Sequence, residues 1–355
     1  MSQDISFLER LLDAQGPSGF EVRPARVWRA EAETFASDVH VDVTGNSFAT
    51  VNPGGTPRVM LAGHIDEIGL QITHIGDDGY IYIDEIGGWD PQVLVGQRVS
   101  ILSRRGDVPG VIGKKAIHLM TVDDRTKASE TKKLWVDVGA TSKDEVASLG
   151  IRVGDPMVLS QSLLRLAGDR IASRAIDDRI GAFVVLEALR LLAADPPTAC
   201  TTAVATVQEE IGYSGGGARS SAYAIEPDVA IAVDVTFSTD VPDVEKKELG
   251  DHKLGGGPVL SRGSAAHNGV FEMLASVAED EGIPYTIQAS PKATRTDADG
   301  IFLTRSGVPT GLVSIPNRYM HSPNEVVSIQ DLFQSAKLIA AFIRRLTPET
   351  DFTPR

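Results

Sequence analysis

Five short segments of this chain place an acidic residue or a histidine at the end of an apolar run. Carboxylate oxygens and imidazole nitrogens, with no thiolate among them, suit zinc, cobalt or manganese ions. A hydrolase that uses two metal ions needs about five such ligands and one free carboxylate as a base. The sequence therefore predicts a dinuclear metal site. The candidate residues, in chain order, are His64, Asp66, Asp177, Glu209, Glu210, Asp234 and His321.

The adjacent acids Glu209 and Glu210 are the most specific local signal. They follow the apolar segment 201–207, and neighbouring carboxylates repel one another unless a cation or a proton separates them. Because adjacent strand residues point in opposite directions, one carboxylate could bind a metal while the other reaches the attacking water as general base. A solvated acidic strand end is the alternative reading of the pair.

His64 and Asp177 are weaker signals when each is taken alone. His64 follows the apolar segment 57–62, and Asp66, two residues further on, could orient the imidazole ring of His64. Asp177 precedes a helix predicted over residues 180–192. Its carboxylate could bridge two cations, or it could cap that helix by accepting backbone N–H bonds.

Asp234 and His321 extend the pattern to two further strands. Asp234 lies inside the apolar stretch 230–235, where burying an unpaired carboxylate is costly and a metal ion would offset the cost. His321 follows a strand predicted over 311–315 and precedes the last predicted helix. Each candidate thus stands where open α/β sheets keep their sites.

The apolar pattern predicts an α/β protein, in which helices cover both faces of a mostly parallel sheet, interrupted by a β-rich module. Residues 69–159 contain short alternating strands separated by glycine pairs and proline, with little helical periodicity. The candidate residues resume only at Asp177, so the module is expected to interrupt the α/β domain. The predicted helices are 5–12, 180–192, 270–278 and 329–346, and the predicted strands of the α/β part are 57–62, 201–207, 229–235, 285–289 and 311–315.

Composition bounds the remaining possibilities. A chain of 355 residues with 42% hydrophobic content can bury a large core, and its longest apolar stretches are far too short to span a bilayer. The N-terminal residues show neither a basic nor an apolar leader region, so a cytoplasmic protein is expected. A net charge of −14 argues against a nucleic-acid partner. The single Cys200 excludes an intrachain disulfide.

Taken together, the motifs resemble those of the TET aminopeptidases, the glutamyl and leucyl aminopeptidase family of metallopeptidases with two co-catalytic metals. The match follows the family's order along nearly the whole chain. One departure is the glycine-rich segment 211–217. The matching metal motifs are 63–69, 176–181, 207–212, 233–234 and 319–322, and further matching segments are 17–21, 135–140, 150–155 and 296–298.

This resemblance implies a role for each candidate. It implies two divalent metal ions that are bridged by Asp177. Zinc is the expected metal, and cobalt and manganese are the alternatives. Asp66 would orient a metal-binding histidine, and Glu209 would be the general base. The implied ligands besides Asp177 are His64 and Asp234 for one ion, and Glu210 and His321 for the other.

The resemblance also implies a zinc-peptidase-like mixed sheet flanked by helices, with an inserted β-barrel or PDZ-like domain. The catalytic domain would comprise residues 1–66 and 166–355, and the inserted domain, residues 67–165, would mediate dimerisation. Dimers would build a hollow tetrahedral dodecamer. The implied activity is removal of N-terminal residues from short peptides in the cytoplasm.

Several alternatives stay open at the level of sequence. Some members of the family have been described as cellulases, and a glycosidase would use two carboxylates without metal. A non-catalytic scaffold of the same fold is the second rival. Arg262 or Arg295 could select an acidic substrate side chain, whereas an apolar wall would select leucine. His118 and His267 could approach the site, but surface or capping roles are expected for both.

Overall fold

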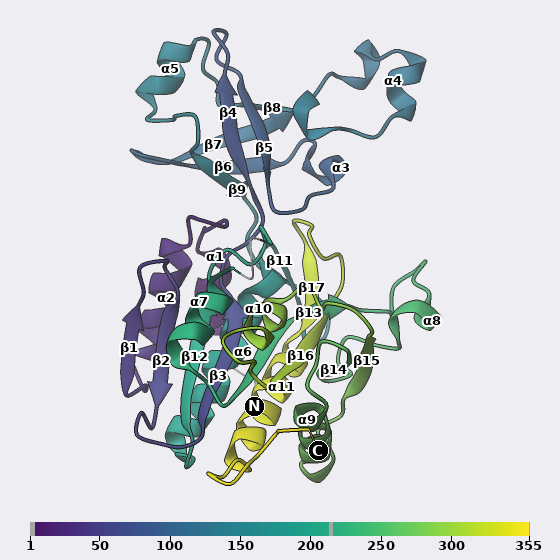
Figure 1. Ribbon diagram of the computed structural model, residues 1–355. Coiled ribbons are helices and arrows are strands. Elements are labelled where there is room, and N and C mark those ends of the chain that lie inside the picture. The colour runs from purple at the N-terminus through teal and green to yellow at the C-terminus, as the bar shows by residue number, and fades with distance from the viewer. Residues whose placement is uncertain (1–3, 213–215, 355) are drawn as a thin grey trace.

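The computed structural model describes residues 4–212 and 216–354, which form a layered α/β body with a β-barrel standing above it (Figure 1). Within these residues the body is built on an eight-stranded mixed sheet with strand order β1-β2-β12-β3-β13-β16-β14-β15. The strands are β1 (Asp38–Val41), β2 (Ser47–Val51), β3 (Arg58–His64), β12 (Cys200–Thr206), β13 (Val229–Phe237), β14 (Val259–Gly263), β15 (Thr286–Ser290) and β16 (Thr310–Asn317).

The centre of this sheet is parallel. β3 pairs in parallel with β12 on one side and β13 on the other, and β13 pairs in parallel with β16. β2 and β14 join this parallel core in antiparallel pairing, so the sheet is mixed. The carboxyl ends of β3, β12, β13 and β16 therefore meet at one edge, from which the chain leaves β3 for the barrel.

Apolar side chains on both faces of β3 explain why helices cover the sheet on both sides. Val59 and Leu61 point into the larger core, which is shared with α1, α2, α6, α9 and α11. Met60 and Ala62, which alternate with them, point into a second core shared with α7 and α10. The helices of the body are α1 (Ser6–Asp13), α2 (Val22–Ala32), α6 (Ile176–Ala194), α7 (Gly216–Ile225), α8 (Lys246–Leu249), α9 (Asn268–Asp280), α10 (Asp297–Phe302) and α11 (Ile329–Arg344).

The inserted module is a closed barrel with strand order β4-β5-β8-β7-β6-β9 and a hydrophobic core of its own. It interrupts the α/β body between β3 and β11, which confirms the predicted architecture. Its strands are β4 (Gly69–Ile75), β5 (Ile81–Ile86), β6 (Arg98–Ser103), β7 (Gly106–Gly113), β8 (Trp135–Asp137) and β9 (Pro156–Leu159). It also carries α3 (Pro91–Leu94), η1 (Ile117–Leu119), α4 (Val122–Thr126), η2 (Thr131–Lys133) and α5 (Lys143–Ser148).

A small sheet, β10-β11-β17, lies between the barrel and the body (Figure 1). It pairs β11 (Arg170–Ser173), which leads into α6, with β17 (Glu325–Ser328), which leads into α11; β10 (Leu164–Arg165) completes it. Two loops of the body that lie far apart in sequence are thereby held beside each other. Among the described helices, none is both long and apolar enough to cross a membrane.

Several elements were not predicted from the sequence. The helix α2 is one of them, because its buried positions have a helical spacing but three of the four, Pro24, Ala25 and Ala32, are small or only weakly apolar beside Trp28. The helix α6 begins at Ile176, before the predicted start at residue 180. β3 runs further than predicted, so His64 lies at the end of a strand and not after it. β13 extends to Phe237, and Asp234 lies within it as predicted.

Candidate metal centre

Three neighbouring parallel strands bring candidate residues to one edge of the sheet. His64 is the last residue of β3, Glu209 and Glu210 follow β12, and Asp234 lies near the carboxyl end of β13. Because β3 lies between β12 and β13 in the sheet, residues that are far apart in sequence become neighbours at this edge. The strand pairing alone accounts for this half of the site.

Asp177 reaches the same edge from the start of α6, which packs against β3. At this start Asp178, not Asp177, makes the local backbone bonds. The Asp178 carboxylate accepts the N–H of Gly181 at 3.1 Å and that of His64 at 3.2 Å. The Asp177 carboxylate instead faces two imidazoles, with Oδ1 3.2 Å from His64 Nε2 and Oδ2 3.4 Å from His321 Nε2.

His321 is held in place by both the body and the barrel. Its backbone is left-handed (φ 58°), and its N–H donates to Glu325 Oε1 at 3.0 Å. Its ring Nδ1 lies 2.7 Å from the carbonyl oxygen of Gly88, in the loop that follows β5. This contact leaves Nε2 directed at Glu210 Oε2, 3.3 Å away. Glu325 also accepts the N–H of Asp177 at 3.1 Å, so one buried carboxylate positions both residues.

Two groups of potential ligand atoms result, and they share one residue. In each group the atoms lie within 4.8 Å of one another. The first group is His64, Asp177 and Asp234, and the second is Asp177, Glu210 and His321. The two carboxylate oxygens of Asp177 face one histidine in each group, which is the arrangement that a bridging carboxylate requires.

Glu209 and Asp66 lie beside these groups without belonging to either. Glu209 Oε2 is 3.8 Å from His64 Nε2, and its side chain is 17% exposed to the adjoining cavity. Asp66 is buried, with Oδ1 3.4 Å from His64 Nδ1. The Asp66 carboxylate also accepts the backbone N–H groups of Glu209 and Glu210, each at 3.2 Å, and the Ser18 hydroxyl at 2.6 Å. Asp66 thus lies against the His64 ring and fixes the chain that carries the two glutamates.

The electrostatics of the site show uncompensated negative charge. Burial raises the pKa of Glu209 to about 10, and repulsion from Asp234 and Asp297 adds to the effect. Burial likewise raises the pKa of Asp234 well above its usual value, with repulsion from Asp177 as the next cause. Burial also favours a neutral His321, but its ion pairs with Asp177 and Glu210 outweigh that effect and raise its pKa to about 11.

The donor set fits divalent cations. Glu210 Oε1 is buried without a hydrogen-bond partner among the described residues, although a buried carboxylate oxygen ordinarily has one. The groups offer only carboxylate oxygen and imidazole nitrogen, which suit zinc, cobalt and manganese. Cations at this site would supply the positive charge that the surrounding side chains lack.

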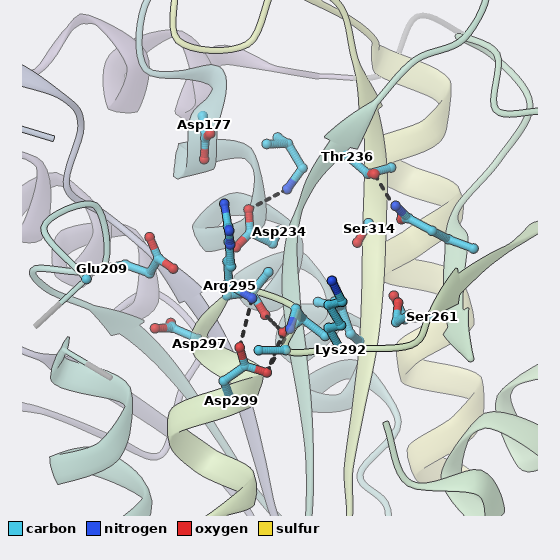
Figure 2. A pocket seen from close by; sticks show the side chains of 18 of the residues that line it. Asp177, Glu209, Asp234, Thr236, Ser261, Lys292, Arg295, Asp297, Asp299 and Ser314 are labelled. Atoms are coloured by element: carbon cyan, nitrogen blue, oxygen red, sulfur yellow. Dashed lines mark hydrogen bonds between the residues drawn. The ribbon is translucent and has the colours of Figure 1, made fainter. Parts of the chain in front are cut away.

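A large cavity of about 1210 Å³ opens beside the centre (Figure 2). Asp177, Glu209 and Asp234 face it from the side of the two groups of potential ligand atoms, as Figure 2 shows, and Ser261 and Ser314 lie on the opposite wall. A substrate in this cavity would lie against both groups of ligand atoms. The centre is therefore open to a molecule of peptide size rather than closed as in a structural metal site.

The M42 glutamyl aminopeptidase family model matches residues 45–338 of this chain. The lysyl aminopeptidase of Pyrococcus furiosus is 35% identical over 353 residues, which cover 99% of each chain. This chain belongs to the M42 glutamyl aminopeptidase family. It is accordingly a metallo-aminopeptidase, a hydrolase of peptide bonds, and its resemblance to the TET aminopeptidases is confirmed.

Solved structures of M42-like aminopeptidases share the whole architecture. The aminopeptidase APDkam598 from the archaeon Desulfurococcus kamchatkensis is 41% identical, with a TM-score of 0.89 over 97% of this chain and 95% of the other. The Pyrococcus horikoshii TET1 peptidase, which can assemble into a tetrahedron or a large octahedral shell, is 31% identical, with a TM-score of 0.85 over 96% of this chain and 99% of the other. The barrel is thus part of a shared fold and not an addition in this chain.

The remaining sequence candidates lie elsewhere in this M42 chain. His118 is exposed in η1 of the barrel, and His267 precedes α9; neither belongs to the two ligand groups. Arg262 pairs with Glu272 at 3.1 Å, outside the cavity, whereas Arg295 lines the cavity. In the glycine-rich segment 211–217, residues 213–215 lie outside the described residues.

Sequence analysis missed residues that support the centre from a distance. Asp178 and Glu325 position the candidate ligands through backbone bonds, and Asp297 lies buried beside Glu209. Burial raises the pKa of Asp297 to about 6, and the Thr206 hydroxyl donates to its Oδ2. A usable signal was present for two of these residues, since Asp178 adjoins a candidate and Asp297 lies in a segment that resembles the family.

Proposed function

We propose that this protein removes N-terminal residues from short peptides by means of two divalent metal ions, with zinc as the expected metal. His64 and Asp234 would hold one ion, Glu210 and His321 the other, and Asp177 both. The observation that supports this most strongly is the position of Asp177, whose two oxygens lie 3.2 and 3.4 Å from histidines of different groups. A carboxylate with no bridging role would need only one such partner.

Glu209 is the proposed general base. Bound divalent ions would polarise the scissile carbonyl group, lower the pKa of a water molecule and stabilise developing negative charge. Glu209 lines the cavity beside both groups but belongs to neither, so its carboxylate remains free to accept a proton. It would take the proton from the attacking water and deliver it to the amine that leaves.

Asp66 is the proposed positioning residue. Its contact with His64 Nδ1 favours the ring form in which Nε2 is the ligand atom. Its bonds to the N–H groups of Glu209 and Glu210 fix the relative positions of the base and a ligand. The buried Asp66 carboxylate would thereby keep the general base, Glu209, at a fixed position relative to both ions.

We also propose that the inserted domain, residues 67–165, forms dimers and that dimers build a tetrahedral dodecamer in the cytoplasm. The assemblies of the Pyrococcus horikoshii TET1 peptidase support this proposal, because that protein shares the barrel as well as the body. Three exposed apolar side chains on the barrel, Ile117, Leu119 and Val122, support it independently.

The rival functions fit the site less well. A glycosidase uses two carboxylates that flank a sugar bond and bind no metal. Here the carboxylates instead lie close to histidines, in two groups whose atoms could bind the same ion. A non-catalytic scaffold needs no carboxylate positioned beside the ligands, yet Asp66 holds the backbone of Glu209 in place. Both features favour a metal-dependent hydrolase.

Hydrolysis of a panel of aminoacyl-anilides by the purified protein tests the proposal. We expect activity that a chelator abolishes and that zinc, cobalt or manganese restores. In Glu209→Gln we expect kcat to fall by about 100- to 10,000-fold, because general base catalysis is lost. The metal content of this variant is expected to match the wild type. Activity that survives chelation, or no cleavage of any unblocked substrate by the metal-loaded protein, would contradict the proposal.

A further inference from the structure

One acidic side chain of the cavity is not accounted for by the candidate metal centre. Asp297 lines the cavity and is 2% exposed, and its Oδ1 is buried without a hydrogen-bond partner among the described residues. Its other oxygen, Oδ2, accepts a hydrogen bond from the Thr206 hydroxyl. A buried carboxylate oxygen ordinarily has a partner, so an oxygen without one calls for an explanation.

Two elements hold Asp297 beside the proposed general base. Asp297 is the first residue of α10, and the next residue, Ala298, packs against β13 and β16. Thr206, which bonds to Asp297, is the last residue of β12, and the chain continues from there to Glu209. Figure 2 shows Asp297 and Glu209 on the same side of the cavity. The Asp297 carboxylate is therefore fixed on the side of the cavity where cleavage is proposed.

The other acidic side chains of the cavity are already engaged. Four of them are the candidate ligands and the proposed base described above. The remaining one, Asp299, accepts the backbone N–H of Thr294 with Oδ1, at 3.0 Å, and that of Arg295 with Oδ2, at 2.8 Å. Residues 213–215, which the structure does not describe, are Tyr, Ser and Gly and add no carboxylate. Outside the candidate metal centre, Asp297 Oδ1 is thus the one carboxylate oxygen of the described cavity wall that has no partner.

The proposed reaction brings a positively charged group close to the bond that is cleaved. The α-amino nitrogen of a peptide lies about 2.5 Å from the carbonyl carbon of the first residue, and it is mostly protonated at neutral pH. Its acceptor must therefore lie near Glu209 and the ligand groups, as Asp297 does. Burial raises the pKa of Asp297 to about 6, so its carboxylate is largely ionised at neutral pH. An ionised carboxylate forms a strong, charge-assisted hydrogen bond with an ammonium group.

We propose that Asp297 Oδ1 accepts a hydrogen bond from the α-ammonium group of the substrate and thereby selects peptides with an unblocked N-terminus. The inference rests on the proposed aminopeptidase function and assigns a specificity-determining residue to the same site. A substrate with a blocked N-terminus would leave the buried Asp297 oxygen without a partner, which is costly. Selection would thus come from a residue that belongs to neither ligand group.

The test compares alanine hydroxamate with propionohydroxamate, two inhibitors that differ only in the ammonium group. Each hydroxamate can chelate a metal ion through its two oxygens, so inhibition constants report binding without turnover. We expect the wild type to bind alanine hydroxamate about 10- to 100-fold more tightly, the effect of a hydrogen bond to a charged group. In Asp297→Asn, whose amide oxygen can still accept the Thr206 hydroxyl, we expect this ratio to approach one. The inhibition constant for propionohydroxamate is expected to be unchanged.

Asp299→Asn is the matched control, because it removes one negative charge from the same helix and the same cavity. Its ratio is expected to stay close to that of the wild type, and both variants are expected to keep the wild-type metal content. If the ratio falls equally in both variants, the overall charge of the cavity causes the preference and the proposal is wrong. If Asp297→Asn weakens both inhibitors equally, Asp297 has only a structural role, which also overturns the proposal.

A crystal structure of the wild type with alanine hydroxamate decides the question if Asp297→Asn does not fold. We expect the ammonium nitrogen to lie within hydrogen-bond distance, about 3 Å, of Asp297 Oδ1. An ammonium nitrogen that instead binds Glu209 or a metal ion would overturn the proposal. Failure of the proposed aminopeptidase function is distinct, because alanyl-anilide would then not be cleaved by the wild type at all.

Discussion

His321 Nδ1 lies 2.7 Å from the carbonyl oxygen of Gly88. Because a carbonyl only accepts, His321 donates from Nδ1 and offers Nε2 to the metal centre. Gly88 belongs to the inserted barrel, whereas His321 belongs to the α/β body. The barrel therefore contributes directly to the geometry of the centre, and any assembly formed through the barrel would be linked to the site by this hydrogen bond.

Single ligand substitutions are expected to change the number of bound metal ions. His321→Ala leaves the group of His64, Asp177 and Asp234 intact, so we expect about one ion per subunit instead of two. Asp177→Ala removes the shared residue, and we expect it to bind neither ion tightly. Metal content after dialysis against trace metal, measured by mass spectrometry, gives the stoichiometry of each variant.

A histidine outside the centre provides the control for these measurements. His118→Ala removes an exposed imidazole of the barrel and is expected to retain two ions and full activity. If His321→Ala binds as much metal as the wild type, the second group is not a metal site. If Asp177→Ala retains both ions, the bridging role assigned to Asp177 is wrong.

Loss of the Glu67 charge is expected to destabilise the fold strongly. Glu67 is buried and pairs with Arg179 at 2.8 Å and with Arg174, both of which are also buried. Glu67→Gln would leave two buried guanidinium groups without a counter-charge, and we expect the free energy of unfolding to fall by about 3–5 kcal/mol. The exposed pair of Glu272 with Arg262 is the control, since Glu272→Gln is expected to cost less than about 1 kcal/mol in the same urea titration. If Glu67→Gln and Glu272→Gln lose the same unfolding free energy, the stabilising role given to the Glu67 charge is wrong.

Much of the centre was predictable because its residues follow strands with a strong apolar signal. The predicted strands 201–207 and 229–235 overlap β12 and β13, and their ends carry Glu209, Glu210 and Asp234. Strand ends of a parallel sheet converge, so a local pattern was enough to indicate a common site. The same reasoning gave the α/β architecture and the interruption by the barrel.

The supporting residues could not be predicted because their partners are remote in sequence. The buried Glu325 carboxylate accepts N–H groups from Asp177, at the start of α6, and from His321, in the loop before β17. Which cation points into the cavity was also undetermined, since it depends on the turn that Asp299 forms around Arg295. Such contacts arise from tertiary packing and leave no periodic pattern in the sequence.

The stability of the protein is expected to depend on the protonation of Glu21. Burial raises the pKa of Glu21 to about 7, and repulsion from Asp66 adds to the effect. Since the folded pKa lies above the unfolded value, folding favours the protonated form. The stabilisation is complete below the unfolded pKa and is lost as the pH rises through about 7.

Glu21→Gln isolates this effect, because both backbone N–H groups that bond to Glu21, those of Gly19 and Gln208, are accepted by Oε1 alone. The amide can keep both bonds without charge. Between pH 5 and pH 8 we expect the wild type to lose about 3 kcal/mol of unfolding free energy relative to the variant. Urea titrations across this range measure the difference. A difference that does not change with pH would contradict the assignment, and the exposed Glu33→Gln serves as the reference.

Assembly is expected to depend on an apolar patch that the barrel exposes between β7 and β8. We define this patch by Ile117, Leu119 and Val122, which are 59%, 70% and 80% exposed. The segment that carries it projects sideways from the barrel, away from the body, as α4 shows in Figure 1. None of the three side chains belongs to the barrel core, so replacing them would leave the fold of the subunit intact.

If the proposed dodecamer forms, glutamine at all three positions of this patch is expected to reduce it to dimers or monomers, because burying an exposed apolar patch against another copy is favourable. Size-exclusion chromatography with light scattering measures the mass. Val43→Gln is the control, since Val43 is equally apolar and fully exposed but lies in the body. If the triple variant and Val43→Gln both have the same mass as the wild type, the contacts between subunits lie elsewhere on the barrel. If instead the wild type is itself a monomer, the proposed role of the barrel in assembly is wrong.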